Sequence, residues 1–171
     1  MLTGGLAPEG RRSRLLVARY ERAVHLESDR LFEFIHTGYF EPWKTDAHDQ
    51  NVTVMRIVAT AAAAFADAGY FTIVDGIISP RWFFEPVRDA LSGAGHTVAY
   101  AVLRAPLATC VARTASRSQC GLVDPIVIEQ LWRDFADLGQ LETHAIDNDE
   151  RSAGATAERL HGKLATGELD A

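Results

Sequence analysis

Cysteine is scarce in this sequence, and its scarcity excludes proteins that depend on a disulfide framework or a cysteine-rich metal site. The 171 residues include only Cys110 and Cys120. Small secreted domains need several cysteines, and structural zinc sites need cysteine or histidine ligands at short, regular spacings. Neither pattern occurs around these two residues. We therefore expect two free thiols in a cytoplasmic protein.

Long hydrophobic runs are also missing. No stretch approaches the roughly 18 consecutive apolar residues that a membrane-spanning helix needs. The first residues lack the basic region and the apolar region of a secretory signal peptide. The sequence therefore predicts no membrane partner.

Positive charge is in deficit, and this deficit argues against nucleic acid as a partner. Seventeen Lys and Arg residues stand against 23 Asp and Glu residues, which gives a net charge of −6. Nucleic acids and anionic membranes attract basic surfaces. A composition of 47% hydrophobic and 23% charged residues is typical of a globular protein. Since this length suits one compact core, we expect residues 1–171 to form a single domain.

A glycine-rich segment stands near the start of the chain. Gly5 and Gly10 have the spacing of the two glycines in a phosphate-binding loop, where Lys and then Ser or Thr follow the second glycine. In such a loop, backbone N–H groups surround phosphate oxygens and a cation meets the outer phosphates. Here Arg11 and Arg12 take those two places, and Ser13 comes one residue later. A flexible segment that binds no ligand is the alternative interpretation.

Hydrophobic patterning predicts alternating strands and helices. The clearest strand is 71–75, which is apolar and β-branched until an acid and a glycine end it. The other expected strands are 1–3, 23–26, 97–103 and 143–146, and the expected helices are 11–20, 29–36, 51 or 53 to 68, 85–91, 106–117, 124–136 and 156–164. Strands separated by helices indicate a parallel sheet that helices cover on both faces. The expected fold class is therefore α/β.

Three details of this pattern bear on the site. Residues 1–3 are fewer than the about five of a usual buried strand, so either the strand starts upstream or it is short. Ser28 is expected to cap the helix 29–36 through its side chain. Residues 37–50 are polar and aromatic, and we expect them to form a loop.

Polar residues follow four of the expected strands. The first strand is followed by the glycine-rich segment, the second by Glu27, Ser28 and Asp29, the third by Asp75 and the fourth by Arg104. Ligands bind at the carboxyl ends of the strands in such sheets. A phosphoryl-transfer site needs a phosphate cradle, an acid and positively charged groups. All three are expected at this edge of the sheet.

These pieces resemble the small P-loop kinases related to nucleoside monophosphate kinases, gluconate kinase and chloramphenicol phosphotransferase. The resembling segments are 3–13, 25–30, 74–76 and 104–107, with Arg113 and Arg117. The resemblance implies a three-layer P-loop kinase-like fold, with a five-stranded parallel sheet and helices on both faces. It also implies ATP and Mg²⁺ as cofactors and a small-molecule phosphoryl acceptor.

The resemblance also implies roles for individual residues. Asp29 would lie near the acceptor as a base or orienting group. Asp75 would be the acid near the metal, usually through a water molecule. The residues that would bind the nucleotide phosphates are Gly5, Gly10, Arg11, Arg12, Ser13, Arg113 and Arg117. Residues 37–50 would form a substrate-side loop, and residues 104–121 a lid-like region.

Each of these residues also has a purely structural interpretation. Asp29 could only favour the positive end of a helix, and Asp75 could cap the turn after its strand. Arg113 and Arg117 share a helix face that could simply be solvated. We expect Arg104 to be structural, and we expect no histidine to be catalytic.

Two functions stay open on the sequence alone. The first is an ATP-dependent phosphotransferase, or kinase, acting on a small polar molecule. The second is a catalytically inactive P-loop-like relic that binds a nucleotide or anion weakly, or a protein partner. Arg11 keeps a positive charge, but Arg12 cannot replace the hydroxyl that normally contacts Mg²⁺. We therefore expect weaker ATP binding and phosphoryl transfer than in a relative with an intact loop.

Overall fold

The fold is built on one five-stranded parallel sheet. A computed structural model describes residues 2–4, 9–115, 124–149 and 151–171. Its strands are β1 (Leu2–Gly4), β2 (Ala23–Glu27), β3 (Phe71–Gly76), β4 (Ala101–Arg104) and β5 (Ala145–Asp147). Their order across the sheet is β2-β3-β1-β4-β5, and each neighbouring pair is parallel. The predicted α/β class with parallel strands is confirmed.

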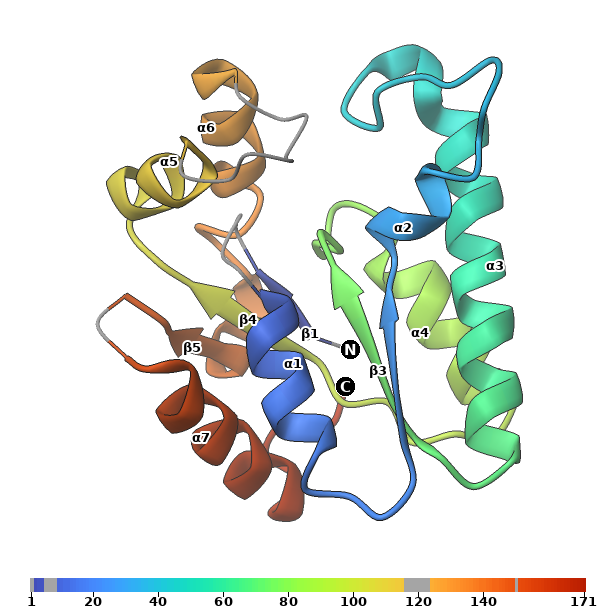
Figure 1. Cartoon of the computed structure of the whole chain (residues 1–171), viewed down its shortest axis with the longest axis vertical. Coiled ribbons are helices and arrows are strands. Elements are labelled where there is room, and N and C mark those ends of the chain that lie inside the picture. The colour runs from blue at the N-terminus through green and yellow to red at the C-terminus, as the bar shows by residue number, and fades with distance from the viewer. Residues whose placement is uncertain (1, 5–8, 116–123, 150) are drawn as a thin grey trace.

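Helices cover both faces of this sheet (Figure 1). The helices of the described residues are α1 (Glu9–Val17), α2 (Asp29–Phe32), α3 (His48–Asp67), α4 (Phe84–Gly93), α5 (Leu107–Ala115), α6 (Pro125–Arg133) and α7 (Ala153–Ala165), with short 3₁₀ helices η1 (Thr45–Ala47) and η2 (Gly139–His144). α1 and α7 pack together on one face, and α3 and α4 pack on the other. Ile73 belongs to the hydrophobic core under α1 and α7, and Val74 to the core under α3 and α4, because successive side chains of a strand point to opposite faces.

A smaller core joins α5 to α6 beyond the carboxyl end of β4 (Figure 1). Cys110 and Ile128 are buried in it. The indole nitrogen of Trp132 donates a hydrogen bond of 2.9 Å to the carbonyl of Ala105, which fixes α6 to the segment after β4. Asp124 caps α6, since its side chain accepts a hydrogen bond from the N–H of Ile126. These two helices therefore form a unit at the edge where the candidate site lies.

Several element boundaries differ from the sequence prediction. α2 ends at Phe32 instead of residue 36, and α3 begins at His48 instead of 51 or 53 because η1 leads directly into it. β4 begins at Ala101 instead of residue 97. β5 begins at Ala145 because the preceding residues form η2, which is held by a bond of 2.9 Å between His144 Nδ1 and the carbonyl of Tyr100.

The predicted side-chain cap of α2 is wrong. Ser28 has helical backbone angles, φ −60° and ψ −33°, and its side chain makes no cap hydrogen bond within the described part of the chain. A capping side chain needs an extended backbone at that position. The backbone N–H of Ser28 instead donates to the carbonyl of Asp75 over 2.9 Å. Ser28 is therefore buried against the end of β3.

Ser28 lies so close to Gly76 that a larger residue at position 76 should destabilise the protein. A methyl group added at Gly76 would lie 1.9 Å from Ser28 Oγ and 3.1 Å from Ser28 Cβ. Because nonbonded atoms cannot approach so closely, Gly76→Ala should lower the free energy of unfolding by about 1–3 kcal/mol in urea denaturation. Adding Ser28→Gly should restore part of the loss.

Gly93, at the end of α4, provides the matched control. The described residues leave nothing within 4 Å of an added Cβ there. Gly93→Ala should leave the free energy of unfolding unchanged or raise it slightly. Equal destabilisation by the two substitutions would contradict the close contact at Gly76.

Candidate active site

The candidate site lies at the carboxyl ends of β2 and β3, where α1 reaches them. Ser13, in α1, is fully buried, and its hydroxyl donates a hydrogen bond of 2.7 Å to Oδ2 of Asp75. Asp75 is the residue before Gly76, the last residue of β3, and is also buried. A hydroxyl beside a carboxylate supplies oxygen atoms of the kind that Mg²⁺ prefers as ligands. The bond joins a helix from the start of the chain to a strand near its middle.

His25, in β2, is the second partner of Asp75. Its Nε2 lies 2.8 Å from Oδ2 of Asp75, the same oxygen that accepts from Ser13. An imidazole that carries its proton on Nε2 would donate to this carboxylate oxygen. The His25 Nδ1 atom lies 3.9 Å from Oε1 of Glu27. Asp75 is therefore held from both α1 and β2.

Strand register explains why these side chains meet. His25 pairs with Ile73 and Glu27 pairs with Asp75 across β2 and β3. Since every second residue of a strand shares a face, all four side chains point to the layer of α1 and α7. Gly10 allows α1 to approach, because an added Cβ there would lie 3.3 Å from Glu27 Oε1.

Two arginines contact Glu27, a half-buried acid whose side chain is 24% exposed. Arg14 donates to Glu27 over 3.5 Å, and Arg30 forms a close ion pair with the same carboxylate. The Arg14 and Arg30 side chains are 68% and 65% exposed, so each pair contributes little to stability. Their charge offsets that of Glu27 at a rim that also carries the carboxylates of Asp29 and Asp75.

The rotation of α1 decides where the residues of the predicted phosphate-binding loop lie. Arg12 and Ser13 are both helical because α1 already begins at Glu9, and each helical residue advances by about 100° around the axis. Arg11 is exposed, Arg12 is buried and Ser13 faces Asp75. Ser13, one residue later than the spacing indicated, therefore brings the hydroxyl to the acid. Gly5 falls in 5–8, outside the described residues.

Asp29 lies at the same rim as Asp75. It is the first residue of α2 and is exposed. A Cβ added at Gly76 would lie 3.7 Å from Asp29 Oδ1, which places the carboxylate beside the end of β3. Burial, followed by the negative charges of Glu41 and Asp29, raises the pKa of Tyr39. Asp29 therefore lies between the sheet edge and the 37–50 segment.

The 37–50 segment is more ordered than a plain loop. It includes η1 and the first residues of α3. The Gln50 amide bonds both the N–H and the carbonyl of Phe40, over 2.9 Å and 2.7 Å, and Asn51 donates to the carbonyl of Pro42 over 2.7 Å. Tyr39 and Phe40 remain 46% exposed. The segment thus presents aromatic side chains on a backbone fixed to α3.

The lid-like region is described only in part. Arg113 donates through Nη2 to the carbonyls of Asn148 and Asp149, at 3.0 Å each, so it ties α5 to the segment after β5. Arg117 falls within residues 116–123, outside the described residues. Arg104 bonds the Glu142 carboxylate and the carbonyl of Ala136, as expected of a structural residue.

Sequence reasoning missed His25. The sequence predicts no catalytic histidine and no contact between His25 and Asp75. The available signal was its spacing from Glu27, because two residues apart in a strand means a shared face. Its contact with Asp75 additionally required the register of β2 against β3, which the sequence does not specify.

A metal at this site would need further ligands from a bound molecule or water. Among the described residues, no group of three or more His, Cys, Asp or Glu side chains could hold a metal ion. Mg²⁺ commonly takes one or two protein oxygens and completes its shell with substrate phosphates and water. The Ser13 and Asp75 pair fits this second arrangement.

In the described ranges, no helix combines the length and apolarity that crossing a membrane requires.

Comparison with known proteins identifies the fold. No protein-family model and no curated protein matches the chain. The structure of a Deinococcus radiodurans tunicamycin resistance protein matches with a TM-score of 0.71 and 16% identity, over 95% of this chain and 92% of that protein. A sugar kinase from Janibacter sp. matches with a TM-score of 0.59 and 18% identity, over 96% and 92%.

A kinase candidate from Chloroflexus aurantiacus matches with a TM-score of 0.63 and 17% identity, over 97% of this chain and 96% of that protein. At sequence identities this low, a structural match shows a common fold alone, because ligands and chemistry depend on the individual residues of the site. The chain therefore has the α/β fold that these three structures share.

Proposed function

We propose that the protein is an ATP-dependent phosphotransferase, or kinase, that acts on a small polar molecule. The observation that carries this proposal is the buried hydrogen bond from Ser13 to Asp75 at the carboxyl edge of the sheet. It brings a hydroxyl from the helix after β1 to a carboxylate at the end of β3. The fold shared with a sugar kinase also supports a phosphotransferase. Phosphoryl transfer depends on such positioned oxygens and on charge stabilisation.

The nucleotide phosphates would lie at the amino end of α1. Free backbone N–H groups at a helix start, together with the exposed Arg11, attract anions. Ser13 and Asp75 would hold Mg²⁺, the carboxylate through a water molecule. When bound, Mg²⁺ supplies charge neutralisation on the phosphate oxygens. His25 would position Asp75 by donating to Oδ2, so that the carboxylate keeps its orientation.

The acceptor would bind between Asp29 and the 37–50 segment. A carboxylate at the rim can accept the proton of an attacking hydroxyl or orient it. Tyr39 and Phe40 offer exposed aromatic faces next to it, and Gln50 fixes the backbone of Phe40. A rigid aromatic surface beside a carboxylate suits a small molecule that carries hydroxyl groups. Arg113 and Arg117 would belong to the lid over the nucleotide.

A catalytically inactive relic is the second candidate, and the buried position of Arg12 favours it. Arg12 is only 5% exposed. A guanidinium group inside the domain cannot move to meet phosphates as readily as a flexible ammonium group at the surface. In that case the rim would bind a nucleotide or anion weakly, or a protein partner.

Replacing Ser13 tests the proposed cation site. Ser13→Ala should weaken Mg·ATP binding by about tenfold to a hundredfold, because one oxygen near the cation is removed. Calorimetric titration with Mg·ATP, and with ATP in EDTA, measures the difference; binding in EDTA should not change. Ser92→Ala, on the exposed end of α4, is the control. Equal affinities for Ser13→Ala and the control would remove the main support for the kinase.

Replacing Arg12 separates the kinase from the relic. Arg12→Lys should strengthen Mg·ATP binding by about tenfold, the equivalent of one charge-assisted hydrogen bond, and should raise phosphoryl transfer to a panel of hydroxyl compounds. The exposed Arg11, changed to Lys, is the matched control and should have a smaller effect. If neither the unmodified protein nor Arg12→Lys transfers phosphate to any of these compounds, the protein is the inactive relic.

Replacing Arg113 tests how much its hydrogen bonds in the lid-like region stabilise the protein. Because one nitrogen, Nη2, donates to both carbonyl groups and a lysine side chain is one atom shorter, Arg113→Lys should lower the free energy of unfolding by about 1–3 kcal/mol in urea. Arg133→Lys, at a 70% exposed position in α6, should change it little. Loss of nucleotide affinity without loss of stability would instead make Arg113 a nucleotide ligand only.

A further inference from the structure

A groove of about 560 Å³ lies between α3 and α4. Figure 1 shows these two helices side by side on one face of the sheet. One wall is a single face of α3, because the residues that line it recur every three or four positions from Val52 to Asp67. The other wall consists of Phe83, Pro86, Val87 and Ala90. Since Val52, Pro86 and Ala90 are exposed, the groove opens to solvent.

The lining is apolar or small along most of the groove. Ala59, Thr60, Ala63 and Ala64 form the middle of the α3 wall. Side chains this small let the axis of another helix approach to about 8 Å. An apolar groove between two helices therefore suits a third helix with an apolar stripe of its own.

Two opposite charges stand near the ends of the α3 wall. Among the described residues that line the groove, only Arg56 and Asp67 are charged. They are three helical turns apart, about 16 Å, and so lie on the same side of α3. Arg56 is exposed. The arrangement places a positive charge and a negative charge on one surface with small side chains between them.

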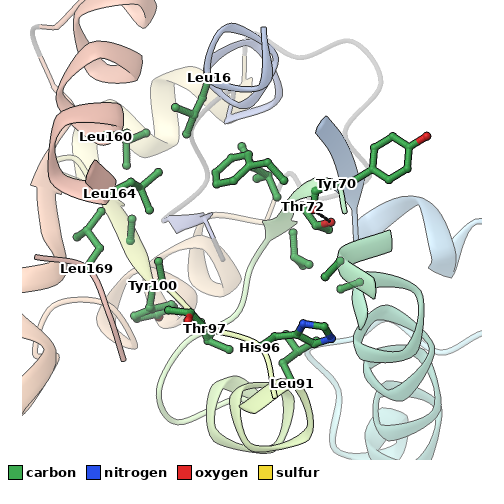
Figure 2. A pocket seen from close by; sticks show the side chains of 18 residues that line it. Leu16, Tyr70, Thr72, Leu91, His96, Thr97, Tyr100, Leu160, Leu164 and Leu169 are labelled. Atoms are coloured by element: carbon green, nitrogen blue, oxygen red, sulfur yellow. Dashed lines mark hydrogen bonds between the residues drawn. The ribbon is translucent and has the colours of Figure 1, made fainter. Parts of the chain in front are cut away.

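Asp67 has one contact within the chain. Its Oδ1 atom lies 3.3 Å from Nε2 of His96. Figure 2 shows His96 beside Leu91, near the end of α4, where the N–H of His96 donates to the carbonyl of Leu91 over 3.1 Å. The Asp67 side chain is nevertheless 72% exposed, and a carboxylate has acceptor sites for several donors. Asp67 can therefore accept from a guanidinium group outside its own chain.

We propose that the groove binds α3 of a second copy of this chain, antiparallel to its own α3. A surface with Arg at one end and Asp at the other is complementary to itself when a two-fold axis relates the copies. Arg56 of each copy then faces Asp67 of the other, which forms two ion pairs. A helix from an unrelated protein would not match both charges for this reason of symmetry. The proposal is independent of the proposed function, because no residue of the groove belongs to the candidate site.

The register that joins these charges also matches the small side chains. With Arg56 opposite Asp67, Thr60 lies opposite Ala63 of the second copy, and Ala59 lies opposite Ala64. The two helices are therefore closest where both carry small residues. Each α3 also contacts the α4 wall of the other copy, so the same surface is buried on both copies.

Sedimentation equilibrium across a dilution series tests the proposal. The unmodified protein should change from the 18.7 kDa of one chain to twice that mass as its concentration rises. Arg56→Asp and Asp67→Arg, each alone, should raise the dissociation constant of the dimer about a hundredfold or more, because like charges then face each other at both ends. An equimolar mixture of the two variants should restore the dimer, because an Arg then faces an Asp at both ends.

Arg159→Asp is the matched control, since it makes the same charge change at an exposed position of α7, on the other face of the sheet. It should leave the dissociation constant unchanged, and mixing it with Arg56→Asp should restore nothing. An unmodified protein that stays monomeric throughout the series would overturn the proposal. Single variants that dimerise as tightly as the unmodified chain would also overturn it, and so would a mixture that stays monomeric.

Hydrogen exchange of the unmodified protein locates the contact without any substitution. Raising the concentration from the monomeric to the dimeric range should slow amide exchange at residues 52–67 and 83–90, while exchange in α7 stays the same. Slower exchange in α7 with no change in α3 would place the contact between copies on another surface and would overturn the proposal.

Discussion

The hydrogen bond between Ser13 and Asp75 fixes the first helix to the sheet, and the geometry of the candidate site depends on it. α1 carries Arg11, Arg12 and Arg14, so its approach to β3 sets how far these arginines lie from the Asp75 carboxylate. Because the bond is buried, its loss would leave a desolvated carboxylate with one donor fewer, a change of about 1–3 kcal/mol. His25 holds the same oxygen from β2. One carboxylate oxygen thus joins a helix and two strands.

The order of strands and helices could be predicted because apolar runs and helix-ending residues are local signals. The segment 71–75, ended by an acid and a glycine, corresponds to β3 with one residue added. Boundaries set by contacts between distant segments could not be predicted. β5 starts at Ala145 because His144 bonds the carbonyl of Tyr100, and no local pattern encodes that contact.

The candidate site could be predicted in part for the same reason. Asp29 and Asp75 reach one rim because parallel strands end on the same side, which the order of elements implies. The residue that brings the hydroxyl to Asp75 could not be read from motif spacing. Spacing counts positions, whereas the rotation of α1 decides that Ser13 and not Arg12 faces β3. The pairing of His25 with Asp75 needed the strand register as well.

The central place of β1 has a consequence for how the chain folds during synthesis. Leu2 pairs with Asp75 on one side and with Ala101 on the other. Both partners are made long after Leu2, and loop closure must precede contacts between segments so far apart. The first residues therefore emerge with their backbone groups exposed to water and to chaperones. The middle of the sheet closes only after β4 has been made.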